Sequence, residues 1–165
     1  MRRYFAIVAV AILVSTIDMA TAGEIQSRLT PAEIAALPLA ENAAGTSGVS
    51  TMRTTVLSGD PAKSGLYTIQ IVIPPHTTIR AHHHRDDRVA TVVSGLWYIG
   101  YGTKREASAL KELSSGGFYT EPAGASHFAG TGDLPAVVHI TGYGPSDTVY
   151  VDAANDPTQQ KPAGR

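Results

Sequence analysis

The sequence contains no cysteine, which excludes a disulfide framework, a thiolate metal site and a cysteine nucleophile. Charged residues are also few, at 16% of 165 residues, and the formal net charge is -1. The longest basic run is the pair Lys104-Arg105, so nothing indicates binding to nucleic acid or to an anionic membrane. The sequence also has no Ser/His/Asp nucleophile motif and no glycine loop of the phosphate-binding type, which argues against a hydrolase or a nucleotide-binding protein.

Hydrophobic residues make up 43% of the chain, enough for one domain with a packed core. Sixteen glycines and ten prolines indicate many turns, as a chain of short strands requires.

The amino terminus has the pattern of a secretory signal peptide. Arg2 and Arg3 form a charged start, residues 4–17 are nearly all apolar, and Ala20-Thr21-Ala22 supplies the small residues that signal peptidase needs. A membrane anchor is the alternative, because the apolar run is only moderately shorter than a membrane span. We predict cleavage after Ala22, which makes residues 1–22 a signal peptide and the mature protein periplasmic or secreted.

Residues 23–49 are expected to form a short helix and a lead-in loop. The helix is predicted to begin at Pro31, with Thr30 as its N-cap and Glu33 closing a capping box, and to end before Pro38. Residues 154–165 are polar and are expected to form a flexible tail.

Residues 50–153 combine short β-branched runs with Gly/Pro turns, a pattern typical of an antiparallel sandwich or barrel. Residues 66–73 alternate between apolar and polar side chains, which predicts a half-buried strand. The runs 88–93 and 96–101 are predicted to pair as a hairpin, and residues 104–113 to form a short helical insertion. Further strands are expected at residues 50–58, 78–84, 118–121 and 137–141, and through Val151.

Three of the six histidines are consecutive, at His82, His83 and His84. Alternate side chains of a strand share a face, so His82 and His84 point to one side and His83 to the other. Two imidazoles on one face can bind a metal ion together if a third ligand comes from elsewhere in the fold. His127 is the candidate for that third ligand, and an accidental surface cluster of histidines is the alternative.

These stretches resemble the two sequence motifs of the cupin superfamily, G-x5-H-x-H-x3,4-E-x6-G and G-x5-P-x-G-x2-H-x3-N. The resemblance covers residues 50–150 of the chain. It implies an all-β fold, a small double-stranded jelly-roll (cupin) β-barrel, but not one reaction, because one fold hosts many chemistries. The residues that fit the motifs are His82, His84, Gly95, Gly116, Pro122, Gly124 and His127.

The chain departs from both motifs. Arg88 stands where the first motif has Glu, Thr131 stands where the second has Asn, and the leading glycine of the first motif is missing.

The resemblance implies one divalent transition metal bound by His82, His84 and His127. Imidazole suits several such ions, so Fe, Zn, Mn, Ni and Cu all remain candidates. Asp87 is a weaker candidate ligand, which requires the turn after His84 to break the strand alternation.

Four residues are candidates for substrate binding: Arg88, Tyr119, Glu121 and His139. Arg88 cannot ligate a cation, because a guanidinium has donors and no acceptor. It therefore pairs with Asp86 or Glu121, or binds an anion such as a substrate carboxylate. Tyr119 and Glu121 share one strand face, whereas His139 is either a buried core histidine or a pocket base.

Three functions are compatible with these patterns. The first is an exported cupin metalloenzyme, of the oxygenase, isomerase or lyase type, that acts on a small anionic molecule. The second is a sensor or binding module without turnover, and the third is a metal-free structural barrel. The expected partner is a small molecule, with carboxylates as one class, and a homodimer is a compatible assembly.

Overall fold

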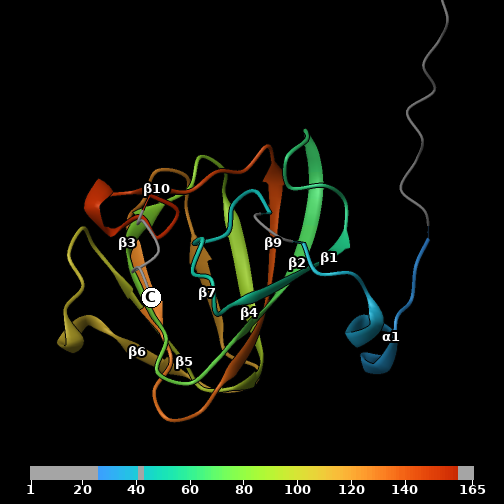
Figure 1. Cartoon of the computed structure of the whole chain (residues 1–165), viewed down its shortest axis with the longest axis horizontal. Coiled ribbons are helices and arrows are strands. Elements are labelled where there is room, and N and C mark those ends of the chain that lie inside the picture. The colour runs from blue at the N-terminus through green and yellow to red at the C-terminus, as the bar shows by residue number, and fades with distance from the viewer. Residues whose placement is uncertain (1–25, 41–42, 160–165) are drawn as a thin grey trace, which may run out of the picture.

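The computed structural model describes residues 26–40 and 43–159 of the chain (Figure 1). The predicted signal peptide, residues 1–22, and the last part of the predicted tail, residues 160–165, lie outside the described residues. Within the described part of the chain, no helix is both long enough and apolar enough to cross a membrane.

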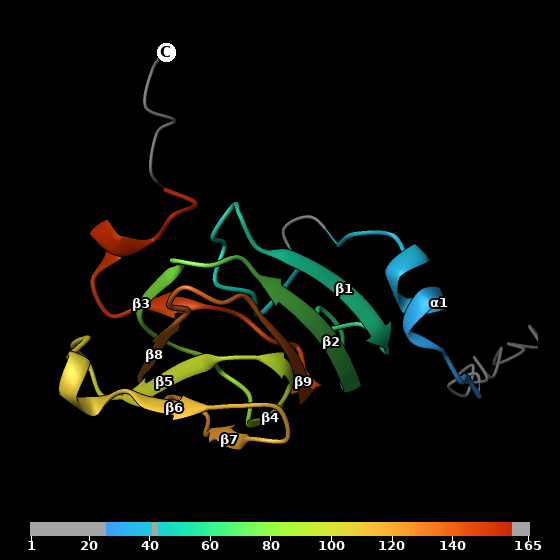
Figure 2. The ribbon, with the colours of Figure 1, turned by 90° about the horizontal axis from the view of Figure 1, so that it is seen from below.

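The described residues form two five-stranded antiparallel sheets, with strand orders β1-β2-β9-β4-β7 and β10-β3-β8-β5-β6. Figures 1 and 2 show the two sheets folded over each other, with the site-bearing strands β3, β4, β7 and β8 on facing walls. This all-β arrangement confirms the predicted double-sheet barrel. The strands are β1 (Arg53–Ser58), β2 (Gly65–Ile73), β3 (Thr78–His83), β4 (Arg88–Gly95), β5 (Trp97–Tyr101), β6 (Lys111–Leu113), β7 (Phe118–Glu121), β8 (His127–Gly130), β9 (Ala136–Gly144) and β10 (Val149–Tyr150).

The core lies between the sheets and follows the alternation read from the sequence. In β2, Tyr67, Ile69, Ile71 and Ile73 are all buried, while the intervening side chains are not. Removal of these side chains from water is the main stabilising contribution, at about 25 cal/mol per Å² of apolar surface.

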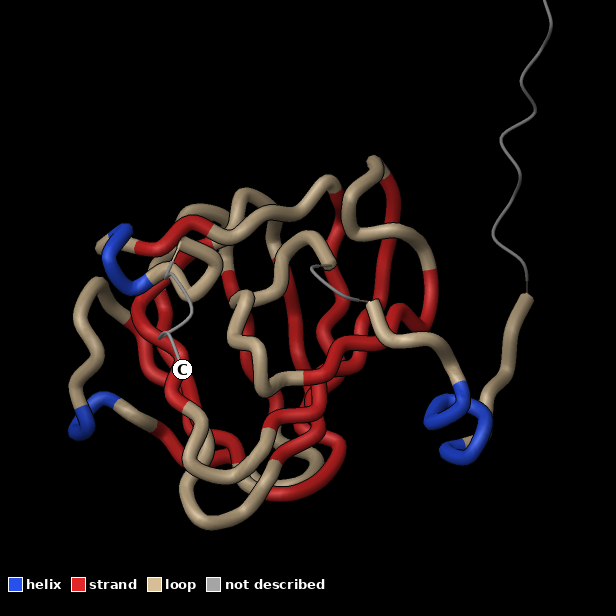
Figure 3. The backbone as a smooth tube through the Cα atoms, in the orientation of Figure 1, coloured by secondary structure: helices blue, strands red, loops and turns tan. Residues whose placement is uncertain are grey.

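The helical segments are short and peripheral (Figure 3). Helix α1 (Pro31–Ala36) has the predicted capping box between Thr30 and Glu33, and none of its residues is buried. The two single-turn 3-10 helices are η1 (Ala107–Ala109) and η2 (Ala153–Asn155).

The predicted short helical insertion at residues 104–113 is present as the single turn η1 and does not extend to the end of that range. Residues Lys111–Leu113 instead form β6, which pairs with β5 from Trp97↔Leu113 to Ile99↔Lys111. The cause is tertiary, because Leu113 packs against the core and the strand pairing satisfies backbone groups that a short helix would leave open.

The predicted hairpin of residues 88–93 and 96–101 is also wrong, because β4 and β5 belong to different sheets. Gly95 separates them with a φ of +80°, and a Cβ at this position would collide with the Pro135 carbonyl. The left-handed glycine therefore passes the chain from one sheet to the other. Residues 50–52 form a turn before β1 and not the start of the predicted strand.

Candidate metal centre

The three predicted ligand histidines lie at one end of the barrel interior. His82 is on β3, His84 directly follows the end of β3, and His127 begins β8. Strand β3 pairs with β8 so that His82 lies directly opposite His127, and a register irregularity falls between Ile79 and His82. This irregularity shifts the alternation, so that Ile79 and His82 both face inward. His82, His84 and His127 are each at most 4% exposed, whereas His83 is only half-buried.

Hydrogen bonds fix which ring nitrogen of each histidine is free. Nδ1 of His82 lies 2.7 Å from the Arg80 carbonyl oxygen, and Nδ1 of His84 lies 2.5 Å from that of Asp147. Nδ1 of His127 lies 3.3 Å from the carbonyl oxygen of Ala125.

A carbonyl oxygen only accepts, so each Nδ1 carries the hydrogen and each Nε2 presents a lone pair. Backbone contacts of this kind hold metal-binding imidazoles in their tautomer and orientation. One ring nitrogen from each histidine lies within 4.8 Å of the others.

Burial keeps the three imidazoles neutral. It lowers the pKa of His82 to about 3, and it lowers the pKa of His84 and of His127 below the ordinary histidine value. Neutral imidazole is the form that binds a metal ion, so no proton has to be removed near neutral pH.

One of the three free nitrogens has no partner. Nε2 of His127 is buried and makes no hydrogen bond to any described residue. A buried unpaired acceptor is costly, and a cation placed beside it would satisfy it. The residues present therefore fit a metal ion.

Arg88 and Glu121 form a buried ion pair next to the histidines. They are direct cross-strand partners on β4 and β7, and each is 3% exposed. Nε of Arg88 donates to Oε2 of Glu121 at 2.6 Å, and Nη2 contacts the same oxygen. Of the two pairings considered for Arg88, the structure contains the one with Glu121, because Asp86 accepts from Tyr67 and Ser146 instead.

The pair fixes the charge state of both groups. Burial by itself raises the pKa of Glu121, but the charge and hydrogen bond of Arg88, together with the neighbouring histidines, outweigh burial and hold that pKa below the usual value. Burial likewise lowers the pKa of Arg88, but the charge and hydrogen bond of Glu121, together with Tyr67 and Tyr119, more than reverse this. Both groups are therefore charged at neutral pH.

The Arg88 guanidinium makes two further contacts. Nη1 donates to the Gly45 carbonyl at 2.5 Å, and Nη2 lies 2.5 Å from Nε2 of His84. Arg88 thus touches a carboxylate, a backbone carbonyl and one candidate metal ligand at the same time.

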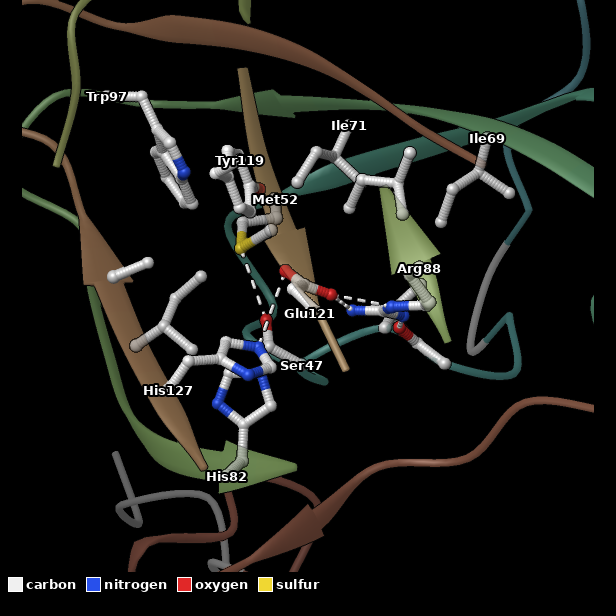
Figure 4. Close-up of a pocket in the computed structure, with 15 residues that line it drawn as sticks. Ser47, Met52, Ile69, Ile71, His82, Arg88, Trp97, Tyr119, Glu121 and His127 are labelled. Atoms are coloured by element: carbon white, nitrogen blue, oxygen red, sulfur yellow. Dashed lines mark hydrogen bonds and ion pairs between the residues drawn. The ribbon is translucent and has the colours of Figure 1, made fainter. Parts of the chain in front are cut away.

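A cavity of about 30 Å³ opens between the histidines and the apolar wall of the barrel (Figure 4). It has room for about two water molecules. Figure 4 shows His82 and His127 at one end, Trp97 and Tyr119 at the other, and Glu121 between them. The lining residues are Gly45, Thr46, Ser47, Met52, Ile69, Ile71, Ile79, His82, Arg88, Trp97, Tyr119, Glu121, His127, Ala129 and Ile140.

Residues 43–48, which we call the strap, border this cavity and were predicted only as a loop. Three consecutive strap carbonyls accept hydrogen bonds from the barrel: Gly45 from Arg88, Thr46 from Thr148 and Ser47 from Tyr150. The strap contributes only backbone carbonyls to these contacts, so its side chains do not predict them. Gly45 and Gly48, both with positive φ, are the only sequence signal of the strap.

Two predicted site residues lie away from the cavity. Asp87 is exposed and accepts a hydrogen bond from the Ala123 backbone N–H, because it points outward from the turn before β4. His139 lies on the outer face of β9, where it contacts Gln70, while its neighbours Val138 and Ile140 point into the core. The expectation that His139 faces the barrel interior is therefore wrong. Arg88, Tyr119 and Glu121 do line the cavity.

Comparison with known proteins supports the fold. The chain matches no family model. It matches no curated protein either. Among solved structures, it is similar to the polyketide cyclase RemF from Streptomyces resistomycificus, with a TM-score of 0.60 and 14% identity over 84% of this chain and 95% of that one.

Two other solved structures are similar. An RmlC-like cupin from Shewanella frigidimarina aligns with a TM-score of 0.52 and 15% identity over 73% of this chain and 92% of the cupin. The DMSP lyase DddQ from Ruegeria pomeroyi aligns with a TM-score of 0.52 and 17% identity over 67% of this chain and 58% of the lyase. At this identity the likeness shows the fold, which is an all-β cupin barrel.

Proposed function

We propose that the chain is a metal-dependent cupin that binds one divalent transition ion through His82, His84 and His127 and presents it to a small molecule. The observation that carries the proposal is the shared tautomer of the three buried imidazoles, each with its Nδ1 bonded to a backbone carbonyl. Three neutral nitrogens then lie close enough to share one ion. Bound there, the ion supplies a Lewis-acid centre.

A catalytic role is favoured over a structural one. Structural metal sites are saturated by protein ligands, whereas catalytic sites keep positions open for water or substrate. Here the histidines border a cavity whose opposite wall is apolar, with Ile69, Ile71 and Ile140 among its residues. A small molecule held in this cavity would be screened from water while it contacts the ion.

An anionic substrate would be anchored by the metal and not by Arg88. Glu121 already neutralises the guanidinium, so a substrate carboxylate would have to displace it. Calorimetric titration with small carboxylates tests this, because binding should require the metal and should persist in Arg88→Lys. Binding to the metal-free protein that Arg88→Lys abolishes would assign the anchor to Arg88.

The strap forms part of the cavity wall. Gly45, Thr46 and Ser47 of the strap line the cavity, so a movement of the strap would change the space that is open to a small molecule. Such gating segments are common at sites that must exclude water during a reaction.

Export and dimer formation are part of the same proposal. Export is supported by the signal-peptide pattern of residues 1–22, and intact-mass analysis of the protein expressed with its own leader tests it.

A homodimer is supported by exposed apolar side chains on one sheet, among them Leu66, Phe118 and Tyr143, and light scattering would detect it.

The main experiment is elemental analysis of protein purified without a His-tag or a nickel column. We expect bound transition metal in a ratio of one ion per chain. Metal together with turnover of a small molecule, such as oxygen uptake, supports the enzyme, and metal without turnover supports a binding module. Protein that holds no metal and takes up none in a titration contradicts the proposal.

A further inference from the structure

We propose that Glu121 is a fourth ligand of the metal ion, so that the carboxylate of the site comes from β7 while position 88 on β4 holds the arginine that positions it. This inference rests on the proposed function, because it names a further ligand of the same ion.

The central observation is a contact between two acceptor atoms. Oε1 of Glu121 lies 3.4 Å from Nε2 of His127. The Nδ1 of His127 faces the Ala125 carbonyl and carries the hydrogen, so Nε2 presents its lone pair to the carboxylate. Two lone pairs facing each other repel unless a proton or a cation lies between them.

The separation fits two ligands of one ion. With metal–ligand distances of about 2.1 Å, neighbouring ligand atoms around one ion are about 3.0 to 3.6 Å apart. The 3.4 Å between Oε1 and Nε2 falls in this range. The other carboxylate oxygen lies 3.8 Å from Nε2 of His84, so Glu121 faces two of the three imidazoles.

Charge supports the same assignment. A divalent ion among three neutral imidazoles and the Arg88 cation would be buried with no compensating anion, which is costly. Asp86 is committed to Tyr67 and Ser146, and Asp87 is exposed. Within the described part of the chain, Glu121 is the buried carboxylate that contacts the histidines.

The contacts of Arg88 leave Oε1 of Glu121 available to the metal ion. Its Nε and Nη2 both contact Oε2 of Glu121, which orients Oε1 toward His127. The direct cross-strand pairing of β4 and β7 brings both side chains to this position. Binding of the ion by His84 requires that the contact between Nη2 of Arg88 and Nε2 of His84 is given up. Arg88 is thus a positioning residue for the carboxylate.

Cobalt(II) is the probe that tests this assignment, because its visible absorption bands report the number and type of its ligands. The metal-free full-length mature protein is titrated with Co²⁺, and affinity is measured by competition with a chelator. The variants are Glu121→Gln, which keeps the shape and removes the charge, and Asp86→Asn, a matched control at a buried carboxylate outside the metal centre.

We expect Glu121→Gln to shift the Co²⁺ bands and to weaken binding by at least about 10-fold, while Asp86→Asn leaves the bands in place. Wild-type bands and affinity in Glu121→Gln would overturn this inference alone, because Glu121 would then not be a ligand of the ion. Failure of the wild type to bind Co²⁺ would overturn the proposed function as well.

Glu121→Gln leaves Arg88 unpaired and could therefore fail to fold, which far-UV circular dichroism would show. Glu121→Asp then replaces it, because it keeps the charge and withdraws the oxygens by one methylene. A changed Co²⁺ spectrum in Glu121→Asp supports ligation by Glu121, and a wild-type spectrum contradicts it.

Discussion

Arg88 and Glu121 face each other directly across β4 and β7, and Nε of Arg88 donates to Oε2 of Glu121 at 2.6 Å inside the barrel. Each member of such a pair depends on the other, because an unpaired charge in a buried position is far more costly than a neutral side chain.

The first prediction follows for stability. Arg88→Leu should lower the free energy of unfolding of the metal-free protein by about 3–5 kcal/mol, because it leaves Glu121 charged and unpaired. The double variant Arg88→Leu/Glu121→Leu should recover much of that loss. Urea denaturation measures both values, and equal stability of the single and double variants would show that an unpaired Glu121 is not the source of the loss.

The second prediction concerns the stability of the protein at acidic pH. The folded pKa of His82 is about 3, against 6.5 for an unperturbed histidine. Between these values the unfolded chain binds a proton that the folded chain does not, so stability falls as the pH falls. The loss from His82 alone should be about 1.4 kcal/mol per pH unit below pH 6.5.

Urea midpoints of the metal-free protein near neutral pH and in mild acid measure this loss. His82→Gln, which does not titrate, should show a smaller dependence on pH. A pH dependence identical to that of the wild type would mean that His82 is already protonated in the folded protein.

The third prediction concerns the strap. The Tyr150 hydroxyl donates to the Ser47 carbonyl at 2.6 Å in a buried position. Tyr150→Phe should cost about 1–3 kcal/mol, because it leaves that carbonyl without a partner. Hydrogen exchange should also become faster in residues 43–48.

Tyr98→Phe is the matched control, since Tyr98 donates to Glu112 in an exposed hydrogen bond. It should change neither stability nor strap exchange appreciably. Strap exchange that is unaffected by Tyr150→Phe would show that other contacts hold the strap.

Periodicity predicted the parts of the fold that depend on local alternation. The inward face of β2 and the shared burial of His82 and His84 followed from the two-residue repeat of a strand. The sides of β9 could not be distinguished in this way, because Val137 and Val138 place apolar residues on both faces. His139 was expected in the interior because of its neighbours Val138 and Ile140, but these two take the inward face and His139 lies outside.

Other features depend on contacts that local patterns do not contain. The sequence left the partner of Arg88 open between Asp86 and Glu121, and the β4–β7 register decides it. The strap is bound through backbone carbonyls, which every residue carries, so the sequence could not show these contacts. The prediction of a β4–β5 hairpin was wrong because Ser94-Gly95 has the pattern of a simple turn, whereas the chain passes from one sheet to the other there.

The most direct test of the account is the metal content of three single variants, measured after identical loading and dialysis. His82→Ala and His127→Ala each remove an inward Nε2 and should lose most of the bound metal. His83→Ala removes a histidine that faces away from the centre and should retain it. If His83→Ala loses as much metal as His82→Ala, or if all three retain the metal of the wild type, the ion is not held by this set of histidines.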